Sequence, residues 1–193
     1  MGMVAMIAAL LSAVTAAPAQ AISRDSRVKT LVIAANAGDS FHSTLRLNFD
    51  SPISQQQAAA ITSAMAGPTV TPTGESMWCL GYISRNDANS TFYIQYNCGS
   101  PRTLTWGWKL SASLQSVIVS SVSEIGLQWW RNGAFAGQNA PHVVPKDYTI
   151  HGTMNPVYAG NDIDYQDYAT FRHNVGTGGT GSVSWAGSVI LRN

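Results

Sequence analysis

The chain has few charged residues, and this scarcity excludes several classes of protein. Lys, Arg, Asp and Glu make up 11% of the 193 residues, and the formal net charge is +1. A nucleic-acid-binding protein needs a basic surface to neutralise phosphates, and this sequence contains no basic cluster. No run of Lys and Arg favours attraction to anionic lipid either. We therefore expect no nucleic-acid partner and no membrane partner for the mature chain.

Glutamate is nearly missing, and the common catalytic motifs are missing as well. The two glutamates are Glu75 and Glu124. Glycoside hydrolysis usually needs two carboxylates about 5 to 9 Å apart across a cleft. The sequence has no H-E-x-x-H zinc motif and no G-x-S-x-G nucleophile elbow. It therefore favours a protein that is not an enzyme, with a hydrolase built from scattered Asp, Ser and His residues as an alternative.

Cysteine is also scarce, since Cys79 and Cys98 are the only two. A structural zinc site would need close pairs such as C-x-x-C, and none is present. Two cysteines in an exported chain predict one disulfide. Closing a loop of this size contributes about 3 kcal/mol in the chain-entropy model.

The first residues form a short, uncharged apolar segment. Residues 3–17 are rich in Ala, Leu and Val, and residues 19–21 have the small-x-small pattern that signal peptidase accepts. A transmembrane helix needs about 20 apolar residues, so this segment is too short for one. We predict a signal peptide over residues 1–21 and a secreted single domain over residues 22–193, with an uncleaved N-terminal anchor as the alternative.

One helix is predicted, at about residues 54–66. Ser54 and Gln57 form the S-x-x-Q capping box of a helix N-terminus. Gly67 suits the position just past its end, and Pro68 prevents it from continuing. The alternation of Leu and Phe with polar residues over 43–49 instead predicts a half-buried strand.

The remaining pattern is one of short strands and tight turns. Strands over 77–83 and 91–97 form a predicted hairpin with an exposed turn at 85–89, and Asn132-Gly133 is a strong signal for a second hairpin. We predict a mainly β fold, an antiparallel β-sandwich or barrel with one short helix. An α+β open sheet with one packed helix is the alternative.

The region from residue 77 to residue 109 is expected to brace the fold. It contains both cysteines and three of the six tryptophans, Trp78, Trp106 and Trp108, which we expect to enter the core. Asn89 begins an N-glycosylation acceptor motif on the turn that is predicted to be exposed.

Aromatic residues in the second half of the chain are the candidate ligand-binding residues. Trp129 and Trp130 are adjacent, so in a strand they point to opposite faces and one of them must lie outside the core. Tyr158, Tyr165 and Tyr168 add flat surface nearby. Exposed aromatic rings bind partner pockets and the apolar faces of sugars. The alternative is that all six tryptophans belong to the core.

An acidic segment at residues 160–167 is the candidate metal site. Asp162, Asp164 and Asp167 place three carboxylates within six positions, and Ca²⁺ prefers oxygen ligands. The EF-hand pattern does not fit, because its central Gly and its final Glu are missing. A solvated acidic turn is the alternative. Beyond possible calcium, we expect no cofactor.

These features support three hypotheses for function. The first is a small secreted binding protein that is not an enzyme and takes an extracellular carbohydrate or protein through its exposed aromatics. The second is the secreted hydrolase named above. The third is a secreted inhibitor or toxin-like protein that acts through the turn at residues 85–89.

Overall fold

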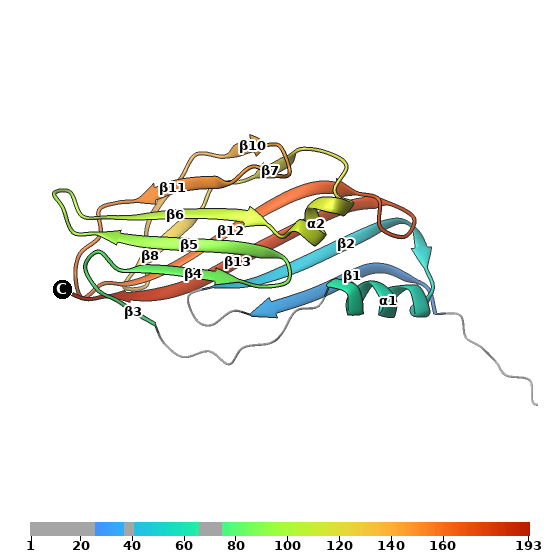
Figure 1. Cartoon of the computed structure of the whole chain (residues 1–193), viewed down its shortest axis with the longest axis horizontal. Coiled ribbons are helices and arrows are strands. Elements are labelled where there is room, and N and C mark those ends of the chain that lie inside the picture. The colour runs from blue at the N-terminus through green and yellow to red at the C-terminus, as the bar shows by residue number, and fades with distance from the viewer. Residues whose placement is uncertain (1–25, 37–40, 66–74) are drawn as a thin grey trace, which may run out of the picture.

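The structure of the protein is a computed structural model that describes residues 26–36, 41–65 and 75–193 (Figure 1). The signal peptide predicted over residues 1–21 lies outside the described residues. In the described part of the chain no helix is long and apolar enough to span a bilayer. The elements are β1 (Val28–Asn36), β2 (His42–Ile53), α1 (Gln55–Met65), β3 (Ser76–Met77), β4 (Tyr82–Asn86), β5 (Ser90–Asn97), β6 (Thr103–Leu110), α2 (Ala112–Val117), β7 (Val122–Glu124), β8 (Gln128–Arg131), β9 (Ala134–Gln138), β10 (His142–Val144), β11 (Ile150–Met154), β12 (Asp162–His173) and β13 (Gly179–Leu191).

The strands form two sheets that pack face to face. The larger sheet has nine strands and the path β1-β2-β13-β12-β7-β10, with β8 also paired to β12, β9 to β8, and β3 to β13. The smaller sheet has the order β11-β6-β5-β4, and Figure 1 shows it in front of β12 and β13. All pairs are antiparallel except β3 with β13. The prediction of a β-sandwich with a short helix is confirmed, and the described strands form neither a closed barrel nor a single open sheet.

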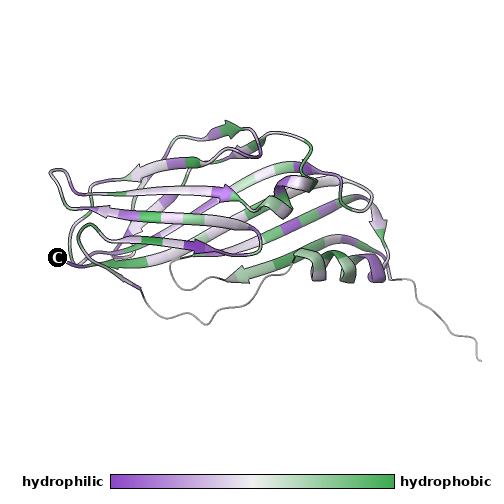
Figure 2. Ribbon diagram, viewed as in Figure 1, coloured by the Kyte–Doolittle hydropathy of each residue, from purple (hydrophilic) through white to green (hydrophobic). Residues whose placement is uncertain are grey.

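The longest strands of the larger sheet, β12 and β13, form its centre. Their register continues without interruption from the pair Asp162–Ile190 to the pair His173–Gly179. Along β12, buried and exposed residues alternate strictly over most of its length. Successive side chains of a strand point to opposite faces, so one face of β12 meets the smaller sheet and the other meets solvent. Figure 2 shows the resulting alternation of hydrophobic and hydrophilic residues along the strands.

Stacked aromatic rings hold the two sheets together. The rings of Trp108 in β6 and Trp185 in β13 stack with centroids 3.9 Å apart and planes 6° apart. Phe92 in β5 stacks on Phe41 and on Tyr165, with centroids 5.1 Å apart in both pairs. All five side chains are buried. Each of these contacts joins residues that are distant in sequence, so the aromatic stacks define how the sheets face each other.

Trp78 does not enter this core, contrary to expectation. Trp106 and Trp108 are buried as predicted, but the side chain of Trp78 is 63% exposed. The reason is that only residues 82–86 form the first strand of the predicted hairpin. Met77, by contrast, pairs with Leu191 in the larger sheet. Trp78 therefore lies in the turn between two sheets.

The predicted helix and its capping box are confirmed. α1 begins at Gln55, where the Gln57 amide donates to Ser54 Oγ and the Ser54 amide donates to Gln57 Oε1. Sequence reasoning missed α2, which is six residues long. Its N-cap is Ser111, whose side chain accepts a hydrogen bond from the Leu114 amide.

Both predicted hairpins are present, but the turn before β5 is not exposed as expected. Asn132 and Gly133 have φ values of 51° and 77°, as the tight turn between β8 and β9 requires. Asp87 and Asn89 are buried, and Asn89 Nδ2 donates to Ser43 Oγ at 3.0 Å. The turn thus packs on β2, which buries the acceptor asparagine of the glycosylation motif and keeps part of the 85–89 turn from protruding.

The disulfide prediction is confirmed. Cys79 and Cys98 are bonded, with their Cα atoms 5.6 Å apart. The bond joins the turn after β3 to the end of β5, so it links the two strands of the first hairpin at their open end.

A pair of tryptophan variants tests which aromatic residues stabilise the sandwich. We expect Trp185→Ala to lower the free energy of unfolding by about 3 to 5 kcal/mol, because it removes one ring of the stack between the sheets and leaves a cavity. Trp78→Ala is the control, and we expect a change within about 0.5 kcal/mol because the side chain is exposed. Urea denaturation followed by circular dichroism measures both, and equal losses would contradict the assignment of the core.

Candidate functional site

The five aromatic residues predicted to bind ligand do not share one surface. Trp129 and Tyr165 are register partners on the inner face of the larger sheet and are 5% and 1% exposed. Trp130 is half-buried on the outer face, and Tyr168 is exposed on the same face. Tyr158 is exposed in the loop between β11 and β12. Trp129 and Tyr165 therefore belong to the core and offer no surface to a ligand.

A glycine opposite Trp129 explains its burial. The strand places Trp129 and Trp130 on opposite faces, as predicted. Gly137 is the register partner of Trp129 in β9, and a Cβ atom added there would lie 2.3 Å from the indole ring. The inner face at this position is therefore shaped to hold the tryptophan.

The outer face around Trp130 carries a second aromatic ring. Phe135 in β9 is the register partner of Trp130, and the two rings meet edge to face with centroids 5.8 Å apart. Phe135 is 60% exposed. Edge-to-face packing fixes the relative orientation of the rings, so they form a defined apolar platform on the surface.

Polar side chains surround this platform. Gln128 lies between Gln138 and Gln166 on neighbouring strands, and its amide joins theirs through hydrogen bonds of 3.4 Å each. Asp164 is the register partner of Trp130 on β12 and is exposed. Partial burial and the nearby charge of Asp162 raise the pKa of Asp164. We define the Trp130 face by its six members: Gln128, Trp130, Phe135, Gln138, Asp164 and Gln166.

Sequence reasoning found Trp130 but missed the other members of this face. Phe135 had a usable signal, because a two-residue Asn-Gly turn pairs the residues on either side of it in a fixed register. Gln166 and Asp164 had none, since the pairing of β12 with β8 joins residues more than thirty positions apart.

The three predicted calcium ligands do not form one site. Asp162 and Asp164 lie on the outer face of β12, whereas Asp167 lies on the inner face and is 4% exposed. The three aspartates lie in strand β12 and not in a turn, so an odd spacing places their carboxylates on opposite faces. Among the residues that the structure describes, no group of three His, Cys, Asp or Glu side chains is placed to hold a metal.

Asp167 instead belongs to a buried acid cluster that the sequence did not reveal. Glu124, at the end of β7, has a side chain with no exposed surface. Its Oε2 accepts the backbone N–H of His142 at 3.0 Å and lies 3.1 Å from His142 Nδ1. Burial, a hydrogen bond with Glu124 and the charge of Glu124 raise the pKa of Asp167 to about 10. The raised pKa favours the protonated form of Asp167 at neutral pH, and this is the form in which Asp167 donates to Glu124.

An irregularity in the larger sheet creates the space for this cluster. β12 pairs with β8 up to Gln166 and with β7 from Ala169 onward, so its partner changes at Asp167 and Tyr168. At this break the Tyr168 amide donates to Asp167 Oδ1 at 2.6 Å. The Asp167 side chain thus accepts a hydrogen bond from the Tyr168 N–H, which lacks a strand partner at this break. In an unbroken ladder a neighbouring strand would accept that bond.

The acid cluster has the residue types of a hydrolase site but not its access. Glu124 and Asp167 are closed off from solvent, and His142, 37% exposed, lies over Glu124. General acid or base catalysis needs the carboxyl group within hydrogen-bond reach of the substrate. The two carboxyl groups contact each other inside the larger sheet, where they are closed off from solvent.

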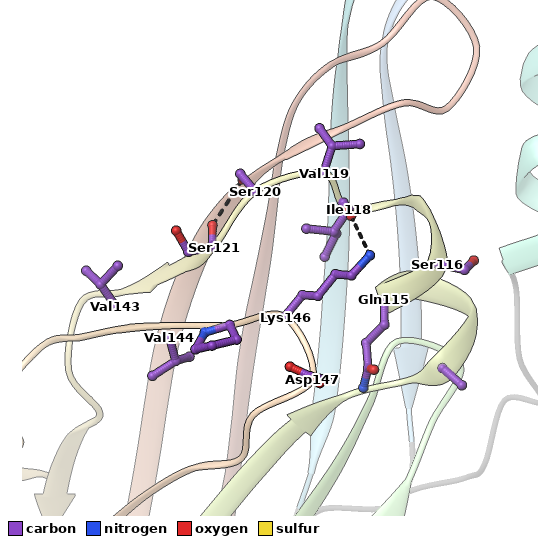
Figure 3. A pocket seen from close by; sticks show the side chains of 12 residues that line it. Gln115, Ser116, Ile118, Val119, Ser120, Ser121, Val143, Val144, Lys146 and Asp147 are labelled. Atoms are coloured by element: carbon purple, nitrogen blue, oxygen red, sulfur yellow. Dashed lines mark hydrogen bonds between the residues drawn. The ribbon is translucent and has the colours of Figure 1, made fainter.

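An open cavity of about 940 Å³ lies between α2, the segment before β7 and the β10–β11 loop (Figure 3). Its walls are largely apolar, including Ile118 and Val144. Lys146 reaches across it and donates to the Ile118 carbonyl at 2.9 Å. Ser116, Ser120, Ser121 and Asp147 also line the cavity, and its lining includes no histidine or cysteine.

No family model matches this chain, and no curated protein matches it. Among solved structures, the chain is similar to a Jonesia denitrificans lytic polysaccharide monooxygenase studied by neutron crystallography. The match has 14% sequence identity and a TM-score of 0.21. It covers 46% of this chain and 53% of that chain, so the chain spans about half the length of that protein. A likeness of this extent carries no functional argument.

The acid cluster predicts a dependence of stability on pH. Because the pKa of Asp167 is raised in the folded protein, the stability that this group contributes is fully present below about pH 4 and is lost as pH rises towards about 10. Asp167→Asn keeps a neutral donor next to Glu124. We expect its free energy of unfolding to fall less than that of the wild type between about pH 5 and about pH 9, by at most about 1.4 kcal/mol per pH unit.

Urea denaturation at several pH values, followed by tryptophan fluorescence, measures this difference. Asp147→Asn is the matched control, because Asp147 is an exposed carboxylate outside the core. Equal pH slopes for the wild type and Asp167→Asn would show that Asp167 is not protonated in the fold.

Proposed function

We propose that the protein is a secreted carbohydrate-binding protein that holds an extended polysaccharide on the Trp130 face. The observation that carries this proposal is the contact of Trp130 and Phe135 on the outer face of the larger sheet, beside three hydrogen-bonded glutamines. The protein acts by binding, and the buried acids Glu124 and Asp167 take no part in chemistry.

The chemistry of the Trp130 face matches the two kinds of surface on a sugar. An aromatic ring packs against the C–H groups on the apolar face of a pyranose ring and removes both from water. The amide of a glutamine both donates and accepts hydrogen bonds, as a sugar hydroxyl does. Asp164 adds a carboxylate that accepts from hydroxyl groups. A ring pair bordered by Gln128 and Gln166 offers both contacts side by side.

The shape of the face favours a polymer over a small ligand. These residues lie on the surface of a sheet and not in an enclosed pocket of the kind that surrounds most of a small molecule. Gln128 and Trp130 lie two positions apart on the same face of β8. Their register partners on β12 are Gln166 and Asp164. A chain of sugar units lying along or across these strands would meet several such groups, so weak contacts would add up.

Secretion is part of this proposal. The disulfide between Cys79 and Cys98 is stable in an oxidising compartment. A surface made polar by amides and hydroxyl groups also suits a partner without charge. Extracellular polysaccharides are ligands that such a protein would meet.

Binding to insoluble polysaccharides tests the proposal. The mature protein is mixed with cellulose, chitin, xylan and β-glucan, and the bound fraction is measured by depletion. We expect binding to at least one of them, weakened about tenfold or more by Trp130→Ala and by Phe135→Ala, because each removes a stacking surface.

Tyr148→Ala is the matched control, since Tyr148 is an exposed aromatic residue before β11 and outside the Trp130 face. We expect this variant to bind as the wild type does. Unchanged binding of the Trp130 and Phe135 variants, or no binding to any polysaccharide, would refute the proposal.

A further inference from the structure

The loop between β3 and β4, together with the first residue of β4, presents three large apolar side chains to solvent. Trp78 is 63% exposed, Leu80 72% and Tyr82 59%. We call residues 78–82 the disulfide tip, because Cys79 within it is bonded to Cys98. Tyr82 also stacks on Tyr93, with ring centroids 6.0 Å apart. The tip is therefore a braced structure with apolar groups pointing outward.

The backbone of the tip is strained in a way that exposes Leu80. Leu80 has a φ of 60°, a left-handed conformation that bulky residues rarely adopt. The Gly81 amide donates to the Trp78 carbonyl at 2.7 Å, and a Cβ atom on Gly81 would lie 2.6 Å from that oxygen. Gly or Asn at position 80 would fit this turn with less strain. Leucine at that position costs stability and gains no core contact, which suggests a role at the surface.

Three arginines that are far apart in sequence lie at the same end of the sandwich. Arg192 lies next to the tip, since its amide donates to the Met77 carbonyl at 2.8 Å. Arg102 and Cys98 line one hollow together with Tyr158, and the guanidinium of Arg131 lies 5.5 Å from the Tyr158 ring centre. Figure 1 shows this end at the left, where the C-terminus and the β3–β4 loop meet.

We propose that this end of the sandwich docks on a lipid bilayer that contains anionic phospholipids, with Trp78, Leu80 and Tyr82 entering the interface. Tryptophan and tyrosine side chains favour the boundary between headgroups and acyl chains, and leucine favours the acyl region just beneath. The arginines would then face the phosphate groups, to which guanidinium binds well. Of the carboxylates at this end, Asp162 precedes the register partner of Arg131, and Glu75, just before β3, is paired with Arg85.

The tip fits a bilayer better than a protein or a sugar. Its three apolar side chains expose roughly 400 Å² together, given the usual size of such side chains. A stable protein interface buries about 800 Å² on each partner, so the tip alone is too small for one. Leu80 has no hydrogen-bonding group for sugar hydroxyls. A bilayer requires only that apolar groups at a convex tip become buried, and this tip offers them.

The sequence did not predict a membrane partner, because it contains no run of basic residues. Folding changes that conclusion, since Arg102, Arg131 and Arg192 come from three separate segments. The apolar side chains of the tip are separate from the Trp130 face, because β13 and β12 lie between β3, which precedes the tip, and β8, which carries Trp130. Arg131 directly follows Trp130 on β8, so the arginine variant of the test changes Arg102 and Arg192 instead.

Co-sedimentation with vesicles tests the proposal. The mature protein is mixed with vesicles of phosphatidylcholine alone and of phosphatidylcholine with phosphatidylserine. We expect binding to the anionic vesicles, about tenfold weaker or more for a variant with Trp78→Ser and Leu80→Ser. Arg102→Gln with Arg192→Gln should remove the preference for anionic vesicles, and added salt should do the same to the wild type.

Val143→Ser is the matched control, because Val143 is 72% exposed on β10, outside the tip. It should bind vesicles as the wild type does. The tip variant should keep its polysaccharide binding, and Trp130→Ala should keep its vesicle binding, so that failure of one proposal is separable from failure of the other. Equal vesicle binding of the tip variant and the wild type would overturn the inference. A wild-type dimer that the tip variant abolishes, seen by light scattering, would also overturn it and identify a second copy as the partner.

Discussion

The stacked rings between the two sheets are the contact on which the rest of this structure depends. Trp108 on Trp185 and Phe92 between Phe41 and Tyr165 join strands that no short loop connects. Large flat rings have few rotamers and bury much apolar area, so they set both the spacing and the orientation of the sheets. Because one face of β12 and β13 packs on these rings, the alternation along the strands points every other residue towards solvent. The Trp130 face is part of the solvent-facing side that results.

The same commitment explains why two acids lie inside the protein. Asp167 takes an inward position because its neighbours Tyr165 and Ala169 do, and no solvent-facing alternative exists without shifting the whole strand by one residue. A lone buried carboxylate would cost several kcal/mol. Protonation of Asp167 and its hydrogen bond to Glu124 lower that cost, and His142 supplies the remaining donors to Glu124. The cluster thus resembles an active site in composition, while its position in the core gives it a structural role.

Local signals in the sequence predicted the local structure well. The capping box at Ser54, the Asn132-Gly133 turn and the disulfide depend on residues near each other in the chain or on a single possible pairing, and each was predicted. The burial of Asn89 was not, because it depends on Ser43, forty-six positions away. The candidate site was predicted only in part, because some of its members are close in sequence and others are distant. Adjacency in the chain required that either Trp129 or Trp130 face outward, but only the pairing of β12 with β8 brings Gln166 and Asp164 beside it.

Residues that the fold does not use are the best guide to what this protein does. Trp185 and Trp129 are accounted for by packing, and Glu124 and Asp167 by each other. Phe135 and Leu80 have no such account: each exposes more than half of an apolar side chain, and Leu80 does so in a strained conformation. The two differ in their surroundings, because amides border Phe135 whereas aromatic rings and arginines lie near Leu80. A ligand rich in hydroxyl groups suits the surroundings of Phe135, and a phospholipid surface suits those of Leu80. One sandwich can therefore offer two surfaces of different chemistry without a change in its core.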